Sequence, residues 1–184
     1  MTAARAQRGS LLVAAPTMLD PNFARTVVLL VAHGVDGAMG VILNRPSDMR
    51  VGEALPRLEP VAAPDVLFVG GPVGDGTLLA LGTGRRVDSI EEVEEIVPGV
   101  GLVPMGEEGA PGCALEQARL FVDYAGWSPG QLEAEVGRGD WIVVDALPGD
   151  AFTADPDALW AEVLRRQGGP VSWLANAPLD PTTN

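Results

Sequence analysis

The chain has 184 residues, of which 47% are hydrophobic, and its 12 basic and 25 acidic residues give a formal net charge of −13. This length can bury the core of one domain without disulfides or structural metals, so we expect a single domain over residues 1–184 with flexible ends at 1–9 and 178–184. Nucleic-acid and membrane binders rely on clustered basic side chains, but adjacent basic residues occur only at Arg85-Arg86 and Arg165-Arg166. The charge therefore argues against direct nucleic-acid or membrane binding. We expect an unknown protein or small-molecule partner, and a monomer or small homo-oligomer.

Cysteine content and hydropathy bear on the compartment. The single cysteine, Cys113, cannot form an internal disulfide and fits a reducing cytosol. The apolar runs are much shorter than a membrane span, and the one near the start is too short for the core of a signal peptide. We therefore expect a cytoplasmic protein.

The first half of the chain predicts strands separated by turns. Residues 26–33 are apolar and β-branched without alternation, which indicates a strand covered on both faces. Asp36-Gly37 separates this run from residues 39–44 and predicts a hairpin, although Gly34 and Val35 suggest a loop longer than two residues. Further expected elements are a strand at 10–15, a turn around 20–22, a short helix over 51–58, and strands at 66–69 and 77–81.

The second half is less uniform. Residues 85–99 fit either a helix or a strand, and residues 155–166 predict a helix with Asp155 as N-cap and Pro156 at its first position. Gly168-Gly169-Pro170 should end that helix. The other expected elements are strands at 100–103, 120–123 and 141–144, a flexible acidic loop at 106–112, a helical turn at 114–119, and a short apolar piece at 171–175. Because several strands follow one another without helices between them, we expect an α/β (α+β) domain with a mixed sheet.

Residues 126–130 read Gly-Trp-Ser-Pro-Gly, a match to the G-x-S-x-G nucleophile elbow of serine hydrolases. Such an elbow uses the backbone N–H of the residue after the serine, but Pro129 has none. The only histidine, His33, also precedes the serine in the chain, whereas the base of this family follows it. We therefore interpret Ser128 as a helix N-cap, with Pro129 at the first helical position.

Neighbouring residues complete that interpretation of the start of a helix. Gln131 would close a capping box with Ser128, and Trp127 could pack on Leu132 as a hydrophobic staple. Gly137 would end the helix.

The glycine-rich run at residues 70–76 follows an expected strand, the usual place of a phosphate-binding loop. It matches neither phosphate-loop pattern, since the chain contains no lysine and strand-like sequence follows. Pro72 also removes one potential N–H donor. We favour a tight connection between two strands.

No cofactor, metal site or catalytic set is indicated. One histidine and one cysteine cannot build a structural zinc site, and we interpret Cys113 as an inert thiol because no cation adjoins it. His33 fits a hydrogen-bonded imidazole at the end of a strand.

One group of polar and aromatic residues at expected strand ends forms a hypothetical ligand site. Strand ends are where α/β proteins commonly bind ligands. Its members are Asn44, Arg45, Tyr124, Gly126, Trp127, Gly130 and Glu133.

Five segments resemble the YqgE/AlgH family of bacterial proteins, and the resemblance covers nearly the whole chain. The match is most specific at Tyr-Ala-Gly-Trp and Gly-Gln-Leu-Glu within residues 124–133. Asp123 stands where the family leads us to expect glycine, and residues 84–118 match poorly. The resembling segments are residues 11–16, 20–30, His33 with 37–46, 68–73 and 124–133.

The resemblance implies a mixed, partly barrel-like sheet surrounded by helices, and it implies no established activity. One branch of the family carries the name of a transcriptional regulator, a role that the acidic charge would restrict to action through a protein partner. Our leading hypothesis is a non-enzymatic ligand- or protein-binding domain in a regulatory setting. The alternative is a hydrolase or phospho-ligand enzyme using Asn44, Arg45, Tyr124 and Glu133, and direct DNA regulation ranks last.

Overall fold

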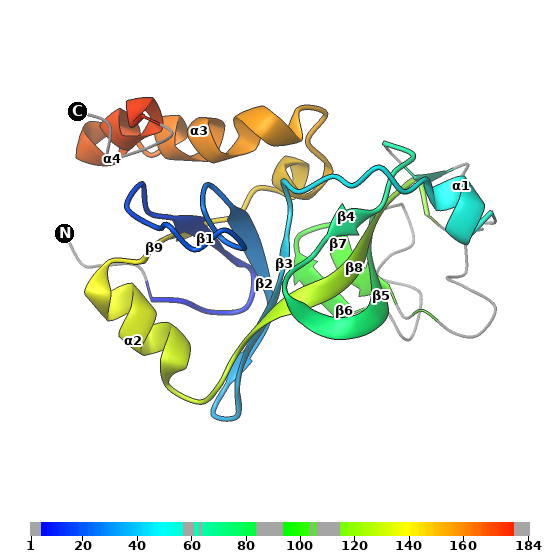
Figure 1. The fold of residues 1–184 in the computed structure, drawn as a ribbon, viewed down its shortest axis with the longest axis horizontal. Helices are drawn as coiled ribbons and strands as arrows, with labels where there is room; N and C mark the ends of the chain where they lie inside the picture. Colours follow the sequence, from blue (N-terminus) through cyan, green and yellow to red (C-terminus); the bar gives the residue numbers. More distant parts are fainter. Residues whose placement is uncertain are drawn as a thin grey trace.

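The computed structural model describes residues 5–56, 61–62, 64–83, 94–103, 105 and 115–178. Within these residues a curled sheet is surrounded by short helices (Figure 1). The strands are β1 (Ser10–Ala14), β2 (Val27–Gly34), β3 (Gly37–Ile42), β4 (Phe68–Val69), β5 (Val73–Thr83), β6 (Glu94–Val97), β7 (Val100–Val103), β8 (Gln117–Trp127) and β9 (Trp141–Asp145). The helices are α1 (Val51–Ala54), α2 (Gln131–Arg138), α3 (Pro156–Arg166) and α4 (Gly169–Trp173), with 3-10 turns η3 (Pro148–Phe152) and η4 (Leu174–Asn176).

The strands run in the order β6-β7-β5-β8-β3-β2-β1-β9. Neighbours along this path are antiparallel, and β4 pairs with β8 in parallel. The sheet is therefore mixed, and it curls into a half-barrel. This confirms the α+β class and the partly barrel-like sheet that the resemblance implied.

The β1–β2 half of the sheet is covered on both faces. Leu11 belongs to a buried cluster with Leu159 and Val163 of α3, whereas its neighbour Leu12 belongs to a second cluster with Leu132 of α2. Figure 1 shows α3 and α2 on opposite sides of these strands. Successive strand residues point to opposite faces, so apolar side chains are required at every covered position. This confirms the interpretation for residues 26–31, which are all buried, whereas Ala32 is exposed and His33 is half-buried.

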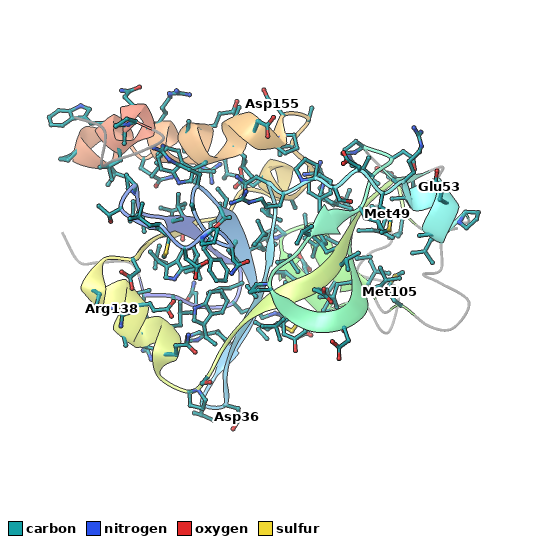
Figure 2. All side chains as sticks on the ribbon, viewed as in Figure 1. Asp36, Met49, Glu53, Met105, Arg138 and Asp155 are labelled. Atoms are coloured by element: carbon teal, nitrogen blue, oxygen red, sulfur yellow. The ribbon has the colours of Figure 1, made fainter. Side chains whose placement is uncertain are left out.

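The hairpin between β2 and β3 is tighter than expected. Gly34 pairs with Gly37, which leaves Val35 and Asp36 as a two-residue loop, and the prediction of a longer loop was wrong. Gly37 has a φ of 121°, and a Cβ there would lie 2.2 Å from the Trp127 carbonyl oxygen. Asp36 marks the tip of this hairpin in Figure 2.

Strand β8 pairs with β3, β4 and β5. Its length is the point at which the structure differs most from the sequence prediction. The helical turn expected at 114–119 is wrong for its described part, because Gln117, Ala118 and Arg119 pair with β5. The strand expected at 120–123 also continues to Trp127, since Gly126 and Trp127 pair with β3. The hydrogen bonds of two partner strands extend this element beyond what local sequence suggests.

The ends of several other elements also differ from those predicted from the sequence. The described part of the ambiguous segment is strand at β6, the short helix α1 ends at Ala54, and β4 covers only half of the expected 66–69 strand. The apolar piece at 171–175 is helical, in α4 and η4. Residues 57–60, 84–93, 106–114, which include Cys113 and the expected acidic loop, and 179–184 lie outside the described residues.

Helix α3 begins as the sequence predicts. The Asp155 carboxylate accepts a hydrogen bond from the Ala158 N–H at 3.1 Å, and Pro156 follows at the first helical position. The Trp160 indole donates to the Ala14 carbonyl at 2.8 Å, which fixes α3 against β1. None of the described helices is long and apolar enough to cross a membrane.

Candidate functional site

Three segments that carry the family resemblance meet at one surface depression of about 300 Å³, which we call the Arg45 hollow. They are the turn at 20–23, the exit from β3, and the Gly-Gly-Pro connection after β4. The residues that line it are Pro21, Asn22, Ile42, Arg45, Pro46, Val69, Gly71 and Pro72.

Backbone hydrogen bonds hold the floor of the Arg45 hollow. The Ile42 N–H donates to the Gly70 carbonyl at 2.9 Å, and the Val69 N–H donates to the Arg45 carbonyl at 2.8 Å. A Cβ on Gly71 would lie 2.2 Å from the Tyr124 carbonyl carbon, so only glycine fits where this segment crosses β8. Residues 70–72 of the glycine-rich run are therefore a tight connection between β4 and β5, as the sequence analysis favoured, whereas residues 73–76 already belong to β5.

Arg45 supplies the positive charge of this hollow. Its guanidinium donates one hydrogen bond to the Ala24 carbonyl at 2.7 Å, and the described residues provide no further hydrogen-bond or salt-bridge partner for its side chain. A guanidinium carries five N–H donors. Donors remain for a ligand, at the edge of a largely apolar surface.

Asn44 has a structural role, because both ends of its side-chain amide bond to the backbone at the start of β2. Its side-chain amide donates to the Arg25 carbonyl at 2.9 Å, and its side-chain oxygen accepts from the Val27 N–H at 2.9 Å. Arg25 has a φ of 59°, so Asn44 supports a strained turn just before β2. It lines neither of the hollows described here.

A second depression, of about 270 Å³, lies between β8, α2 and the turn at 20–23, and we call it the Glu135 hollow. Arg138, which Figure 2 labels at the end of α2, is one of its lining residues. Its lining residues are Met18, Asp20, Phe23, Gly126, Trp127, Gln131, Glu135, Arg138, Asp140 and Trp141.

Glu135 organises the second hollow. One carboxylate oxygen accepts the indole N–H groups of Trp127 and Trp141, both at 2.8 Å, and the other accepts the Gln131 side-chain amide at 2.9 Å. The two indole rings meet edge to face with centroids 6.0 Å apart, and Phe23 meets Trp141 edge to face at 5.5 Å. Buried indoles need an acceptor, and here one carboxylate serves two of them.

Glu133, on the same helix, lies away from both sets of lining residues. Its carboxylate is 2.8 Å from the His33 Nε2 atom. The pKa of Glu133 is lowered from its ordinary value, first by a hydrogen bond from its own backbone and then by the hydrogen bond with His33. His33 therefore has a side-chain partner at the end of β2, as the sequence suggested.

The seven residues of the hypothetical site do not converge. Arg45 lines one hollow, and Gly126 and Trp127 line the other. Tyr124 packs against the main core cluster, and Gly130 sits in the left-handed region at the start of α2. The four residues of the alternative enzyme hypothesis are thus distributed over separate environments.

Sequence reasoning missed several lining residues. Pro21 and Asn22 were noted only as a turn signal, and Glu135 and Trp141 were not singled out. Glu135 follows Gln131 by four residues on α2, so the two side chains had to meet on one helix face. The sequence spacing of Gln131 and Glu135 could therefore have predicted their contact. The contact of Trp141, from β9, with Glu135 could not have been predicted in this way.

The capping prediction was partly wrong. Helix α2 begins at Gln131, not Pro129, and its N-cap is Gly130, without a side-chain cap. It ends at Arg138 with Gly139, not Gly137, in the left-handed conformation. One half of the expected capping box exists, because the Gln131 side chain accepts the Ser128 N–H at 3.0 Å.

Asp123 explains the departure from the family pattern. It lies in β8 with a φ of 64°, a conformation that favours glycine. Its carboxylate accepts the N–H groups of Gly76 and Thr77 at 2.9 and 3.1 Å. Asp tolerates this conformation better than most residues because its side chain can hydrogen-bond locally.

Within the described residues, no three His, Cys, Asp or Glu side chains are grouped so that they could hold a metal ion.

A family model described as AlgH-like matches residues 11–172. The chain belongs to the AlgH-like family. It is 46% identical over 187 residues to a UPF0301 protein of Thermobifida fusca, covering 96% of this chain and 94% of that protein. A UPF0301 protein of Streptomyces coelicolor is 42% identical over 192 residues, covering 100% and 98% of the two chains.

Two solved structures share the AlgH-like fold. A crystal structure of a Corynebacterium diphtheriae protein matches with a TM-score of 0.87 and 31% identity, covering 96% of this chain and 95% of that one. The solution structure of AlgH from Pseudomonas aeruginosa matches with a TM-score of 0.70 and 30% identity, covering 97% and 98%. The curled sheet is thus a shared architecture, over nearly the full length of each chain.

Proposed function

We propose that this AlgH-like chain is a non-enzymatic, cytoplasmic binding protein whose Arg45 hollow receives a carboxylate group attached to an apolar body. One observation carries the proposal. Arg45 projects a cation, with N–H donors to spare, at the edge of a hollow lined mainly by prolines and aliphatic side chains. Charge-assisted hydrogen bonds to a guanidinium are among the strongest available to a carboxylate.

The composition of the lining favours a carboxylate over a phosphate. Phosphate sites in proteins use several converging backbone N–H groups or a helix N-terminus. Pro21, Pro46 and Pro72 have no N–H at all, and the Ile42 N–H is committed to the Gly70 carbonyl. Few other hydrogen-bond donors therefore accompany Arg45 in the lining, which suits a ligand with a single negative charge.

The apolar part of the ligand would contact Val69, which is 45% exposed, and the proline rings beside it. Exposed aliphatic groups around a polar anchor are typical of small-molecule and peptide sites. A regulatory role would follow if the carboxylate belongs to a signalling metabolite or to a partner protein. The net charge of −13 makes a direct role on DNA the least favoured reading.

A thermal-shift screen tests the proposal. Monocarboxylates with apolar bodies of increasing size, such as butanoate, hexanoate and benzoate, are compared with their neutral amides and with phosphate monoesters. We expect the carboxylates to raise the melting temperature, the amides to have no effect, and Arg45→Gln to abolish the response.

Arg165→Gln is the matched control, because Arg165 lies at the exposed end of α3, distant in sequence from every residue of the hollow. Each variant is compared with its own ligand-free melting temperature. Stabilisation by carboxylates that persists in Arg45→Gln would remove Arg45 from the site. Stabilisation by phosphate monoesters, accompanied by their turnover, would instead support the enzyme alternative.

A further inference from the structure

The lining of the Glu135 hollow contains more carboxylates than cations. Three of its lining residues are carboxylates, Asp20, Glu135 and Asp140, and one is a cation, Arg138. Arg138 is committed to Asp140, through Nη2 at 2.6 Å and Nε at 3.1 Å to the same carboxylate oxygen. Within the described part of the chain, Glu135 forms no salt bridge, and its three hydrogen-bond donors are neutral groups.

Two largely buried indoles hold this carboxylate in place. Trp127 and Trp141 are 6% and 3% exposed, and their N–H edges both donate to Glu135. Phe23 packs against the two indoles, 6.3 Å from the Trp127 ring and 5.5 Å from the Trp141 ring, measured between centroids. The indoles therefore fix the carboxylate, and the carboxylate supplies the attraction for a cation.

We infer that the Glu135 hollow binds an organic cation, a guanidinium or ammonium group that pairs with Glu135 beside Phe23, Trp127 and Trp141. A volume of about 270 Å³ accommodates such a group with part of its carbon chain. A bare metal ion fits less well, because the described residues contain no group of three His, Cys, Asp or Glu side chains that could hold one. Three N–H groups occupy three of the roughly four acceptor positions of the carboxylate. An organic cation can donate to the remaining one without displacing any of them.

This inference is independent of the proposed function. The two hollows have no lining residue in common, although both border the turn at 20–23, with Pro21 and Asn22 in one and Asp20 and Phe23 in the other. They also have opposite electrostatic character. A failure of one site leaves the other untouched.

The test uses the indole N–H signals of the four tryptophans in a two-dimensional NMR spectrum. The indoles of Trp127 and Trp141 both bond to Glu135, whereas the Trp160 indole bonds to the Ala14 carbonyl and Trp173 is exposed. On titration with methylguanidinium, we expect saturable shifts of the Trp127 and Trp141 signals. The signals of Trp160 and Trp173 should stay in place, and neutral methylurea should have no effect.

Two isosteric variants locate the charge. Glu135→Gln keeps an acceptor for the indoles and removes the charge, and it should weaken methylguanidinium binding by about ten-fold or more, the size expected of a charge-assisted hydrogen bond. Glu133→Gln removes a charge two residues away on the same helix, outside the lining set, and should change the dissociation constant by less than about two-fold. Equal effects of the two variants, or the absence of a saturable shift in the wild type, would overturn the inference.

The source of the cation is distinguished by a second ligand. A capped Gly-Arg-Gly peptide that binds about ten-fold more tightly than methylguanidinium would indicate an arginine of a protein partner. Equal affinities would indicate a free small molecule. In either case Glu135→Gln must weaken binding, and a peptide whose binding ignores this variant would contradict the assignment.

Discussion

The Asp123 carboxylate accepts a hydrogen bond from the Gly76 N–H at 2.9 Å, and the Asp123 backbone has a φ of 64°. This contact lies at the register shift of the β5–β8 pairing, between the Leu78–Val122 and Val73–Tyr124 pairs, just before β8 pairs with β3 at Ala125. The start of β5 thus presents N–H groups to an anion, and the anion is part of the chain itself. The contact explains both the unusual residue and the way the loop is held.

Substitutions at Asp123 should separate the cost of backbone strain from the loss of hydrogen bonds. Asp123→Ala loses both hydrogen bonds and keeps the strain, and we expect the free energy of unfolding to fall by about 2 kcal/mol. Asp123→Gly also loses the hydrogen bonds but relieves the strain, so it should be about 1 kcal/mol more stable than the alanine variant. Urea denaturation measures both, with Asp123→Asn as a near-neutral control. An alanine variant as stable as the glycine variant would contradict this account.

The start of α2 should depend on Gly130 and not on Ser128. Gly130 has a φ of 75°, so Gly130→Ala should lower the free energy of unfolding by about 1 kcal/mol. Ser128 caps no N–H with its side chain, so Ser128→Ala should cost less than about 0.5 kcal/mol, where a capping serine would cost about 1 kcal/mol. Denaturant melts of the two variants decide between the observed helix start and the one predicted from sequence.

Arg166 is expected to be the more important of the two adjacent arginines in α3. It donates to both carboxylate oxygens of Asp150, which is 7% exposed, and to the Asp145 carbonyl at 3.1 Å. Arg166→Met leaves a buried carboxylate without its counter-charge, and should cost about 3 kcal/mol in free energy of unfolding. Arg165→Met, next to it and exposed, should cost less than about 0.5 kcal/mol. Similar costs for the two variants would show that the ion pair does not stabilise the fold.

The contact between His33 and Glu133 makes a prediction about pH. The folded-state pKa of Glu133 is lowered, so its contribution to stability is present above the unfolded-state pKa and is lost as pH falls through the folded-state value. His33→Gln removes two of the interactions that lower this pKa, and the pKa of Glu133 should therefore rise. Carboxyl chemical shifts followed through an acid titration measure it. An unchanged or lower pKa in the variant would contradict the role of His33.

The extent of successful prediction follows from which interactions are local. The two-faced burial of β2, the hairpin between β2 and β3 and the cap at Asp155 depend on neighbours in sequence or on strand periodicity, and the sequence predicted all three. The length of β8 and the position of Gly126 in a strand depend on pairing with β3 and β5. No local sequence pattern predicts this pairing. The local sequence therefore predicted a strand over 120–123, which tertiary hydrogen bonds extend in both directions to 117–127.

The candidate site divides in the same way. Arg45 was recognisable because it leaves a predicted strand, and the structure sets it in a hollow. The convergence of the turn at 20–23 with the Gly-Gly-Pro connection is a long-range event. So is the meeting of Trp127 from β8 with Trp141 from β9 at one carboxylate, which the sequence alone could not reveal.

The most direct test of the central claim is where a carboxylate binds. In a titration of uniformly ¹⁵N-labelled protein with benzoate, the proposal predicts saturable shifts of the Arg45 Nε–H signal and of the Asn22, Val69 and Gly71 amides, which all belong to lining residues of the Arg45 hollow. Benzamide should leave these signals unmoved, and Arg45→Gln should abolish the benzoate shifts while Arg165→Gln keeps them. Saturable benzoate shifts elsewhere on the protein, or identical shifts in Arg45→Gln, would contradict the proposed site.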